Sequence, residues 1–417
     1  MVSVNYAPEH AGIAPYSTQT AEHLAACGAE VAVLAGMPHY PAWRVHDDYR
    51  GRWRTVETRA GVRIHRRRHF VPSHQTALLR ALYEVSFFAH GSLAPPAGRP
   101  DLVISQMPAL AGGLIGSRIA CRHGAPHVVM VQDLMGAAAA QSGIRGGGHV
   151  ASCVAGVEAK VLRGAALIGV VHESFVDHVT AMGVPGPRVR VVPNWTHVAP
   201  PTGDRRAVRA RLGWREEEFV VLHSGNMGLK QGLEVLVDTA RIAARATPRM
   251  RVVLMGDGSR RAHLQRLAAV LPNVDLLSPV AGSDFPDVLA AADVLVVTQR
   301  ASVVDMSLPS KLTSYFASGR PVVASVAAQG GTAQEVRRSG AGLVVRPEDP
   351  EALHNAVEEL IRDPERSTAL GARGPAYVRQ RLSPQAGLAR ITAVVSEALA
   401  LPTTEACSLS GPGPGVR

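Results

Sequence analysis

Two short stretches of this sequence place lysine, serine and glycine where a phosphate could bind. The chain has three lysines, at positions 160, 230 and 311, among 44 lysines and arginines. Because lysine is so rare here, a lysine in a glycine-rich turn or at a helix start is less easily explained as an ordinary surface residue. Lys311 follows Ser310 at the predicted start of a helix, and Lys230 lies in the turn SGNMGLKQG, residues 224–232. Backbone N–H groups, a hydroxyl and an ammonium converge at such points. We therefore expect an anion site with phosphate as its ligand, the alternative being a surface lysine that happens to begin a helix.

Further glycines follow the predicted strands of this half. Gly225 precedes Lys230 in the first turn, and Gly256, Asp257 and Gly258 follow the next strand. Each turn alone is a weak signal, because GDG after a strand is often only a tight turn. The patterns GxGxxG and GxxxxGK[ST] are absent from the sequence, which disfavours a standard NAD site and a P-loop ATPase. No DxD or HExxH pattern occurs either, so we expect no metal.

Length and composition predict a soluble protein of two or three domains. The chain has 417 residues, of which 46% are hydrophobic and 4% aromatic, as in ordinary α/β proteins. A formal charge of +10 suits nucleic acid, an acidic membrane surface or an anionic substrate. The arginines are scattered, and no RRM, zinc-finger or helix-turn-helix signature occurs. We therefore disfavour nucleic acid as a partner.

The cysteines and the beginning of the chain favour a cytoplasmic location. Cys27, Cys121, Cys153 and Cys407 show no CxxC pair or metal spacing, and the first three lie in apolar helical patterns, so we expect buried free thiols. The first residues, MVSVNYAPE, have no basic region and no long apolar run, and no stretch is long enough to span a membrane. The first strand is short, so the given sequence could lack a few residues at its start.

The first half alternates short apolar runs with helical patterns. This alternation predicts a parallel, doubly wound sheet. The expected strands cover residues 2–5, 31–35, 61–66, 101–105, 127–132, 166–171 and 189–192, and the expected helices residues 17–27, 77–90, 111–123, 150–163 and 173–182. For the segment HRRRHF from His65 we expect a solvated edge, and a basic patch is the alternative.

The segment THVAPPTGDRR, residues 196–206, is the best linker candidate, because the alternation restarts after it. Strands are expected at 219–224, 251–255, 274–277, 294–298 and 322–325. The fold class is thus α/β, with two facing Rossmann-like domains, parallel sheets and an interdomain cleft. We expect an N-terminal domain at 1–197, a C-terminal domain at 198–384, a final helix at 385–401 and a disordered tail at 402–417.

The order of the motifs carries a family resemblance. NYAPEHAGIAPY, PHYPAW, VQDL, VVPNW, SGNMGLKQGLE, GDGS, LPSKLTSYFASGRPVVAS and GAGLVVRPEDPEAL together resemble the retaining family-4 glycosyltransferases of GT-B fold. The resemblance is closest to the branch of colanic-acid and O-antigen fucosaminyl-type transferases and extends to about residue 400. It is specific because the motifs recur in order at suitable spacings.

The resemblance implies a donor site in the C-terminal half. Gly225, Asn226 and Lys230 match the loop that holds the donor diphosphate, with Asn226 in place of the usual arginine. Gly256, Asp257 and Gly258 belong to the same donor site. The resemblance assigns the base-reading loop to Pro279 and Val280, and the phosphate-capping PSK segment to Ser310 and Lys311.

For the N-terminal half, the resemblance implies contacts with the reacting sugar and the acceptor. Gly12 matches the glycine-rich first loop near the donor diphosphate, and Gln132 and Asp133 match a pair that faces the reacting sugar. The long loop after the second strand offers His39, Tyr40 and Trp43 as acceptor-binding residues. The apolar helix 77–90 is most simply core, but it could contact a membrane or a lipid-linked acceptor.

Two positions depart from the family pattern. The common pattern has two glutamates eight residues apart, one near the donor sugar and one on the ribose hydroxyls. Here the ribose position is Ser314, and the carboxylate before the loop is Asp305. The identity of the donor sugar cannot be transferred through these replacements.

We therefore expect a retaining, metal-independent glycosyltransferase that uses a nucleotide sugar, with UDP as the expected nucleotide, and no other cofactor. Candidate catalytic residues are Gln132, Asp133, Asp305 and Lys311. The acceptor could be a lipid-linked saccharide or a small molecule. Two other classes stay open: a nucleotide-sugar 2-epimerase of the same fold, and a non-catalytic scaffold that binds a nucleotide sugar.

Overall fold

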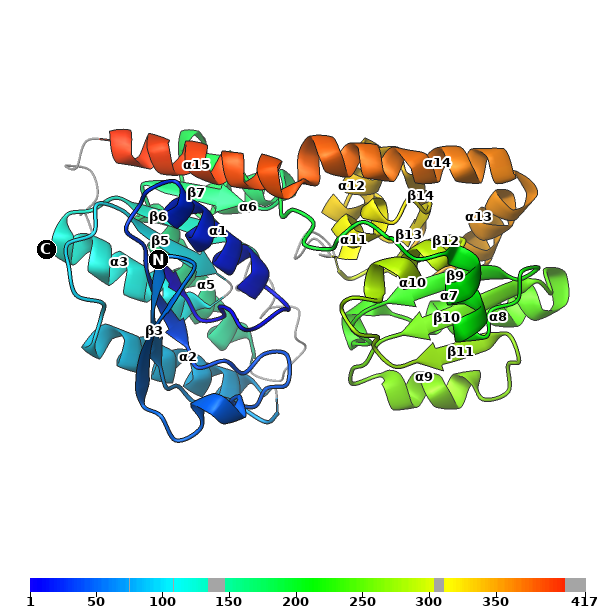
Figure 1. Ribbon diagram of the computed structural model, residues 1–417, viewed down its shortest axis with the longest axis horizontal. Helices are drawn as coiled ribbons and strands as arrows, with labels where there is room; N and C mark the ends of the chain where they lie inside the picture. The colour runs from blue at the N-terminus through cyan, green and yellow to red at the C-terminus, as the bar shows by residue number, and fades with distance from the viewer. Residues whose placement is uncertain (75, 108, 134–146, 304–310, 402–417) are drawn as a thin grey trace, which may run out of the picture. The chain divides into compact units, whose positions relative to one another are not determined.

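The computed structural model describes residues 1–74, 76–107, 109–133, 147–303 and 311–401. These residues form two compact α/β units (Figure 1). Unit 1 comprises Met1–Pro193 together with the chain from Gly387 onward, and unit 2 comprises Asn194–Ala386. The chain thus passes into unit 2 at the start of the proline-rich linker candidate and returns to unit 1 in the last helix.

Unit 1 contains an eight-stranded sheet in the order β3-β4-β2-β1-β5-β6-β7-β8. Every neighbouring pair is parallel except β3 and β4. The strands are β1 (Val2–Ser3), β2 (Ala32–Gly36), β3 (Arg54–Arg59), β4 (Val62–Arg67), β5 (Val103–Met107), β6 (His127–Val131), β7 (Leu167–Val170) and β8 (Val189–Val191). The α-helices in the described part of unit 1 are α1 (Ala14–Ala26), α2 (Ala77–Leu93), α3 (Leu110–His123), α5 (Gly147–Arg163), α6 (Ser174–Ala181) and, for most of its length, α15 (Pro384–Ala400).

Two expectations for unit 1 are wrong. The segment HRRRHF is not a solvated edge: Arg66 and Arg67 are 1% and 7% exposed. The reason is β3, an antiparallel strand that pairs with β4 and covers its outer side. The Arg66 guanidinium donates to the Ala7 carbonyl and pairs with Glu57 of β3. Cys27 is a free thiol, as expected, but it is exposed.

Unit 2 contains a six-stranded, fully parallel sheet in the order β11-β10-β9-β12-β13-β14. This is the strand order of a doubly wound Rossmann sheet. Its strands are β9 (Phe219–Ser224), β10 (Met250–Met255), β11 (Val274–Leu277), β12 (Val294–Thr298), β13 (Val322–Ser325) and β14 (Gly342–Val345). Its helices are α7 (Arg205–Leu212), α8 (Glu234–Ala246), α9 (Arg261–Ala268), α10 (Phe285–Ala291), α11 (Lys311–Ala317), α12 (Gly331–Ser339), α13 (Pro350–Arg362) and α14 (Pro364–Tyr377).

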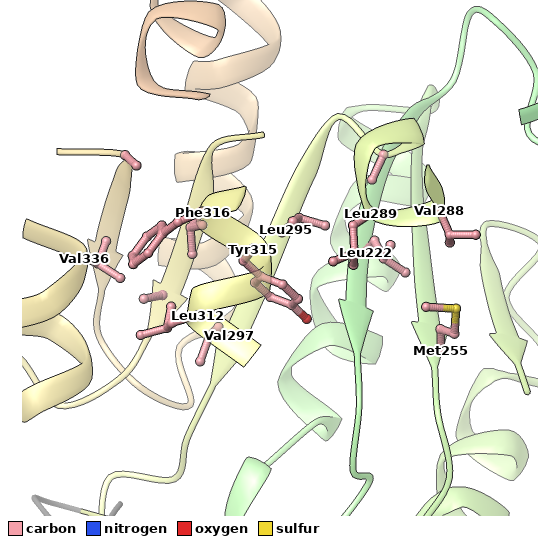
Figure 2. Packing of buried hydrophobic residues seen from close by; sticks show 14 of the residues in the cluster. Leu222, Met255, Val288, Leu289, Leu295, Val297, Leu312, Tyr315, Phe316 and Val336 are labelled. Carbon is pink, nitrogen blue, oxygen red and sulfur yellow. The ribbon is translucent and has the colours of Figure 1, made fainter. Parts of the chain in front are cut away.

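Both faces of the unit 2 sheet are buried, which is why its strands read as continuous apolar runs. Successive side chains of a strand point to opposite faces, so Leu222 enters one core and Val221 the other. Figure 2 shows the first core, in which Tyr315 and Phe316 of α11 pack over the sheet. This packing fixes the position of α11 relative to β9.

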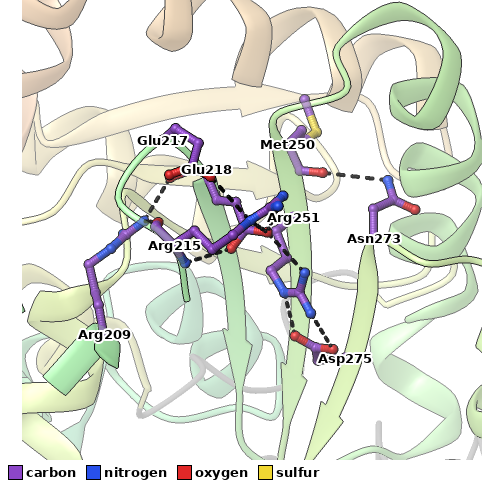
Figure 3. A network of polar contacts seen from close by, with 8 residues as sticks. All are labelled: Arg209, Arg215, Glu217, Glu218, Met250, Arg251, Asn273 and Asp275. Atoms are coloured by element: carbon purple, nitrogen blue, oxygen red, sulfur yellow. Dashed lines mark hydrogen bonds and ion pairs between the residues drawn. The ribbon is translucent and has the colours of Figure 1, made fainter. Parts of the chain in front are cut away.

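Charged side chains occupy the opposite, amino end of the same strands. Arg251 near the start of β10 pairs with Glu218 at 3.0 Å and, through its other terminal nitrogen, with Asp275 of β11 at 2.9 Å (Figure 3). Arg209 of α7 donates to the Glu218 carbonyl at 2.7 Å. These contacts tie β9, β10 and β11 together at one end, and the glycine-rich turns lie at the other.

Candidate active site

The glycine-rich turns after β9 and β10 are hydrogen-bonded to each other. The Gly225 amide donates to the Met255 carbonyl at 2.9 Å, and the Met227 amide donates to the Asp257 carbonyl at 2.8 Å. Because β9 and β10 are parallel neighbours, both turns leave the sheet at its carboxyl edge, where open α/β sheets bind ligands. The structure therefore joins two turns that are weak signals separately.

Gly256 and Gly258 are required because the two turns pack backbone against backbone. Gly256 has a φ of +149°, and a Cβ there would lie 1.9 Å from the Gly225 carbonyl oxygen. Gly258 has a φ of +152°, and its Cβ would lie 2.6 Å from the Met227 carbonyl oxygen. Any side chain at either position would separate the turns. Asp257 shapes the second turn, because its Oδ1 accepts the Gly258 amide at 2.7 Å.

Lys311 is the first described residue of α11, where the sequence predicts a helix to begin. Its Nζ lies 3.2 Å from Nε2 of His223, the penultimate residue of β9. A Cβ on Gly225 would lie 3.2 Å from the same Nζ, so the ammonium lies against the β9 turn. Part of Lys311 is exposed, yet desolvation by the surrounding protein lowers the pKa of its ammonium to about 7.

Lys230 and Asn226 lie on the exposed side of the β9 turn. Within the described ranges, no hydrogen bond or ion pair engages the Lys230 ammonium, which leaves it available to a ligand. A further cation that the sequence did not indicate lies beside it. The Arg300 amide donates to the Lys230 carbonyl at 3.0 Å, and its Nε donates to the Leu229 carbonyl at 2.8 Å. Arg300 is partly neutralised by Glu234, 3.8 Å away.

The remaining donor candidates differ in how far they are exposed. Pro279 is exposed in the loop after β11, and Val280 packs partly against the core. Ser314 is buried in α11, with 5% of its surface exposed. Asp305 and Ser310 lie outside the described residues, so their predicted roles stay predictions.

In unit 1, Glu9 connects the first loop to the loop after β2. Its Oε1 accepts the backbone amides of His39 at 2.7 Å and Tyr40 at 2.8 Å. Its Oε2 accepts the Tyr6 amide at 3.2 Å and the Asn5 side-chain amide at 3.0 Å. Glu9 is 7% exposed. A buried carboxylate that accepts four donors holds both loops in one conformation.

The acceptor candidates form part of an aromatic cluster. The Trp43 ring lies edge-on to His39, Tyr40 and Tyr83, with ring centroids 5.7, 6.0 and 5.9 Å apart. Nδ1 of His39 donates to the Met37 carbonyl at 2.9 Å, so its Nε2 is the acceptor 3.3 Å from the Tyr83 hydroxyl.

Two further loops border this cluster. The guanidinium of Arg80, on α2, lies over the rings of Trp43 and Tyr83, 5.2 and 5.4 Å from their centroids. Gly12, with a φ of +63°, brings the first loop so close to Tyr40 that a Cβ would lie 3.1 Å from its ring. The first loop, the β2 loop and α2 therefore border one site.

Gln132 and Asp133 follow β6 at the carboxyl edge of the unit 1 sheet. Gln132 is buried, and its amide donates to the Met107 carbonyl at 3.0 Å. Asp133 is near enough to Tyr40 to affect it: burial, then the charges of Glu9 and Asp133, raise the pKa of the Tyr40 hydroxyl. The charge of Asp133 therefore lies within electrostatic range of the aromatic cluster.

Besides Arg300, the sequence analysis missed four residues of the two clusters: Glu9, Arg80, Tyr83 and His223. Glu9 and His223 carried one available signal, a charged or titratable residue within or next to an otherwise apolar strand or loop. Arg80 and Tyr83 stood in a helix interpreted mainly as core. All four act through residues distant in the sequence, which no local pattern reveals.

Each unit thus presents a cluster of candidate site residues at the carboxyl edge of a doubly wound sheet. Solved structures of this architecture include sucrose-phosphate synthase from Thermosynechococcus elongatus, with a TM-score of 0.74, 19% identity and coverage of 96% of this chain and 98% of that one. Anabaena HepE in complex with UDP matches with a TM-score of 0.68 and 16% identity, covering 95% of this chain and 99% of that one. The fold is that of the GT-B glycosyltransferases.

The sequence comparisons give the family. Residues 11–195 match the glycosyl transferase 4-like domain, and residues 218–363 match the glycosyl transferases group 1 domain. The colanic acid biosynthesis glycosyl transferase WcaI of Escherichia coli is 29% identical over 88% of this chain and 92% of its own length. A GDP-mannose-dependent mannosyltransferase of Corynebacterium glutamicum is 29% identical over 43% of this chain and 48% of its own length. The chain is a two-domain glycosyltransferase of the GT-B type.

Proposed function

We propose that this glycosyltransferase transfers the sugar of a UDP-sugar to a saccharide, a lipid-linked saccharide or a small molecule. The proposed reaction retains the anomeric configuration and needs no metal ion. The observation that carries the proposal is the Lys311 ammonium, which lies against Gly225 in the interlocked turns of unit 2. Fixed backbone amides and a nearby cation suit a diphosphate. The aromatic cluster of unit 1 suits the acceptor.

The chemistry follows from the leaving group. The bond between a sugar and a diphosphate is already activated, and negative charge develops on the diphosphate as this bond breaks. A preorganised cation and amides stabilise that charge in the transition state. Lys311 and Lys230 supply side-chain cations at this edge, so we propose that Mg²⁺ is not needed for the charge of the donor.

For retention, we propose attack from the face that the diphosphate leaves. The acceptor hydroxyl gives its proton to the departing phosphate oxygen as the new glycosidic bond forms. Such a route needs no carboxylate nucleophile. We propose that Asp133, whose charge acts on Tyr40, orients the reacting sugar and the acceptor.

The nucleotide and the pathway are proposed from relatives. Anabaena HepE was solved with UDP and with UDP-glucose, whereas two curated relatives are GDP-mannose-dependent. WcaI carries the name of a colanic acid biosynthesis glycosyl transferase. We place this enzyme in the cytoplasm, in polysaccharide or secondary-metabolite biosynthesis, with UDP as the first nucleotide to test and GDP as the second.

The proposal is tested by nucleotide release from UDP- and GDP-sugars, with and without candidate acceptors and with and without EDTA. We expect release of UDP that depends on the acceptor, persists in EDTA and yields a product of unchanged anomeric configuration by NMR. Conversion of the donor without acceptor would indicate an epimerase instead. Binding without any conversion would indicate a scaffold, and EDTA inhibition reversed by Mg²⁺ would contradict the metal-free chemistry.

We also propose that α2 contacts an anionic lipid surface that carries the acceptor. None of the helices in the described ranges is long and apolar enough to cross a membrane. However, α2 exposes an apolar stripe that includes Leu78 at 79% and Val85 at 62%. Near its end lies Trp53, 66% exposed, with the Arg68 guanidinium 5.0 Å from the centre of its ring. Exposed apolar and aromatic side chains beside arginines suit the interface of an acidic bilayer.

Replacing Leu78 and Val85 with Asp should lower binding to phosphatidylglycerol vesicles roughly tenfold or more, because burying one such side chain is worth about 1.5 kcal/mol or more. The measurement is co-sedimentation with vesicles. Val270→Asp, at an 80% exposed valine of unit 2, is the matched control and should bind as the wild type does. Equal binding by all variants would contradict the contact.

A further inference from the structure

The donor site proposed above contains the Lys311 ammonium, which contacts no negatively charged side chain among the described residues. In the described part of the chain, the hydrogen-bonding partner of the Lys311 ammonium is His223, and no ion pair to a carboxylate engages Lys311. An ammonium that the surrounding protein largely desolvates, and that has no counter-ion, is costly unless it loses its proton or gains an anion. The anion that the proposed function supplies here is the donor diphosphate.

The hydrogen bonds of His223 fix its tautomer. Nδ1 lies 3.1 Å from the Val296 carbonyl oxygen, which can only accept, so this nitrogen carries the proton. Nε2 is then a lone-pair acceptor, and it lies 3.2 Å from Nζ of Lys311. Burial, reinforced by the Lys311 charge, holds the pKa of His223 well below its usual value. His223 is therefore a neutral acceptor that can fix the direction of the ammonium without neutralising it.

A second contact clamps α11 to the end of β9. The Tyr315 hydroxyl accepts the Ser224 amide at 2.7 Å and donates to the Ser224 carbonyl at 3.1 Å. Tyr315 lies one turn after Lys311 on the same helix, and burial raises the pKa of its hydroxyl, so it stays neutral. The clamp leaves Lys311 little freedom to move away from Gly225.

The remaining charged groups of the two turns are exposed. Lys230 lies on the outer side of the β9 turn, and Asp257 lies in the β10 turn with one oxygen on the Gly258 amide. Neither is linked to Lys311 by a hydrogen bond or an ion pair in the described ranges. Among the residues that the structure describes, the titratable groups that contact Lys311 or the end of β9 are His223 and Tyr315. Both stay neutral near pH 8.

We propose that Lys311 takes up a proton when the donor diphosphate binds, and that His223 is the positioning residue that directs this ammonium at the phosphates. The inference rests on the proposed donor function. In the free protein, Lys311 is largely neutral above pH 7, because burial lowers its pKa to about 7. The bound diphosphate favours the ammonium and raises the pKa again. Above pH 7, each bound nucleotide therefore brings one proton from solvent to Nζ.

UDP affinity should depend on pH only above the pKa of Lys311. Below pH 7, Lys311 already carries its proton, so UDP affinity should not change with its titration. Above pH 7, protonation must accompany binding, and the UDP dissociation constant should rise about tenfold per pH unit. Arginine stays charged throughout this pH range, so Lys311→Arg should bind UDP with an affinity that does not change from pH 7.5 to 9. Such a result would show that the pH dependence comes from Lys311 and not from the nucleotide.

Calorimetry with UDP as titrant tests the coupling from pH 6.5 to 9, in two buffers with different heats of ionisation. The wild type should take up about one proton per UDP at pH 8.5. Lys311→Arg and Lys311→Met should take up none, the first binding UDP independently of pH. Lys230→Met, which removes an exposed cation, should bind more weakly at every pH and keep the proton uptake. Proton uptake that persists in Lys311→Met would overturn the assignment.

The role of His223 is tested by two replacements of similar size. His223→Phe removes the acceptor of the ammonium, so UDP affinity at pH 7 should fall on the order of tenfold and its pH dependence should begin at lower pH. His223→Gln keeps an acceptor oxygen and should restore most of the affinity. Equal UDP binding by His223→Phe and the wild type, in folded protein by circular dichroism, would overturn the positioning role. UDP binding at no pH would instead refute the proposed donor, and pH-independent UDP binding by the wild type would refute only the coupling.

Discussion

Lys311→Ala should lower kcat/KM for transfer by on the order of a hundred- to a thousandfold, without loss of the fold. The replacement removes the cation that lies beside the β9 turn, where negative charge develops on the leaving diphosphate. Loss of one preorganised contact of this kind costs about 2.7–4 kcal/mol of transition-state stabilisation. Initial rates of UDP release at saturating acceptor measure the effect.

The matched control is Lys160→Ala, at the exposed lysine of α5 in unit 1. It removes the same charge and the same side chain far along the chain from the donor turns. We expect wild-type rates for this variant. A drop smaller than fivefold in folded Lys311→Ala protein would remove Lys311 from the catalytic machinery.

Glu9→Ala should destabilise the loops of unit 1 by about 3 kcal/mol and abolish most acceptor use. The replacement leaves the amides of His39, Tyr40 and Tyr6 without their acceptor, and a buried donor without a partner costs about 1–3 kcal/mol. Hydrogen exchange should show faster exchange at the His39 and Tyr40 amides. The acceptor KM should rise at least tenfold.

Glu9→Gln is the informative control for this prediction. Its single carbonyl oxygen can replace Oε1, the atom that accepts the His39 and Tyr40 amides, while its NH₂ cannot replace Oε2. We therefore expect acceptor kinetics between those of the wild type and of Glu9→Ala. If Glu9→Ala left the exchange of both amides unchanged, Glu9 would not hold the two loops together.

The central strands of unit 2 could be predicted from the sequence because they are buried on both faces. The edge strand β14 is only partly buried and was not among the expected strands. Runs such as FVVLHS and MRVVLM carry their own signal, and the turns that follow them are marked by glycine. The sequence also predicts a helix that begins near Ser310 and Lys311, and Lys311 is the first described residue of α11. Local sequence determined these features, so local patterns revealed them.

The missed features depend on contacts between distant residues. β3 was not among the expected strands, and its pairing with β4 explains why Arg66 is buried. His223 stands in an apolar strand and looks like core until Lys311, 88 positions later, is placed beside it. Glu9 likewise meets His39 and Tyr40 across some 30 positions. Spacing along the chain carries no record of such contacts.

The central claim, that unit 2 holds the donor diphosphate and unit 1 the acceptor, is tested most directly by titrating UDP into Trp43→Ala and Lys311→Ala protein. Trp43 belongs to the aromatic cluster of unit 1, so Trp43→Ala should bind UDP as the wild type does while its acceptor KM rises. Lys311→Ala should lose UDP affinity at least tenfold at pH 6.5, where the ammonium of the wild type is charged. If Trp43→Ala abolished UDP binding and Lys311→Ala retained it, the donor would lie in unit 1 and the account would be wrong.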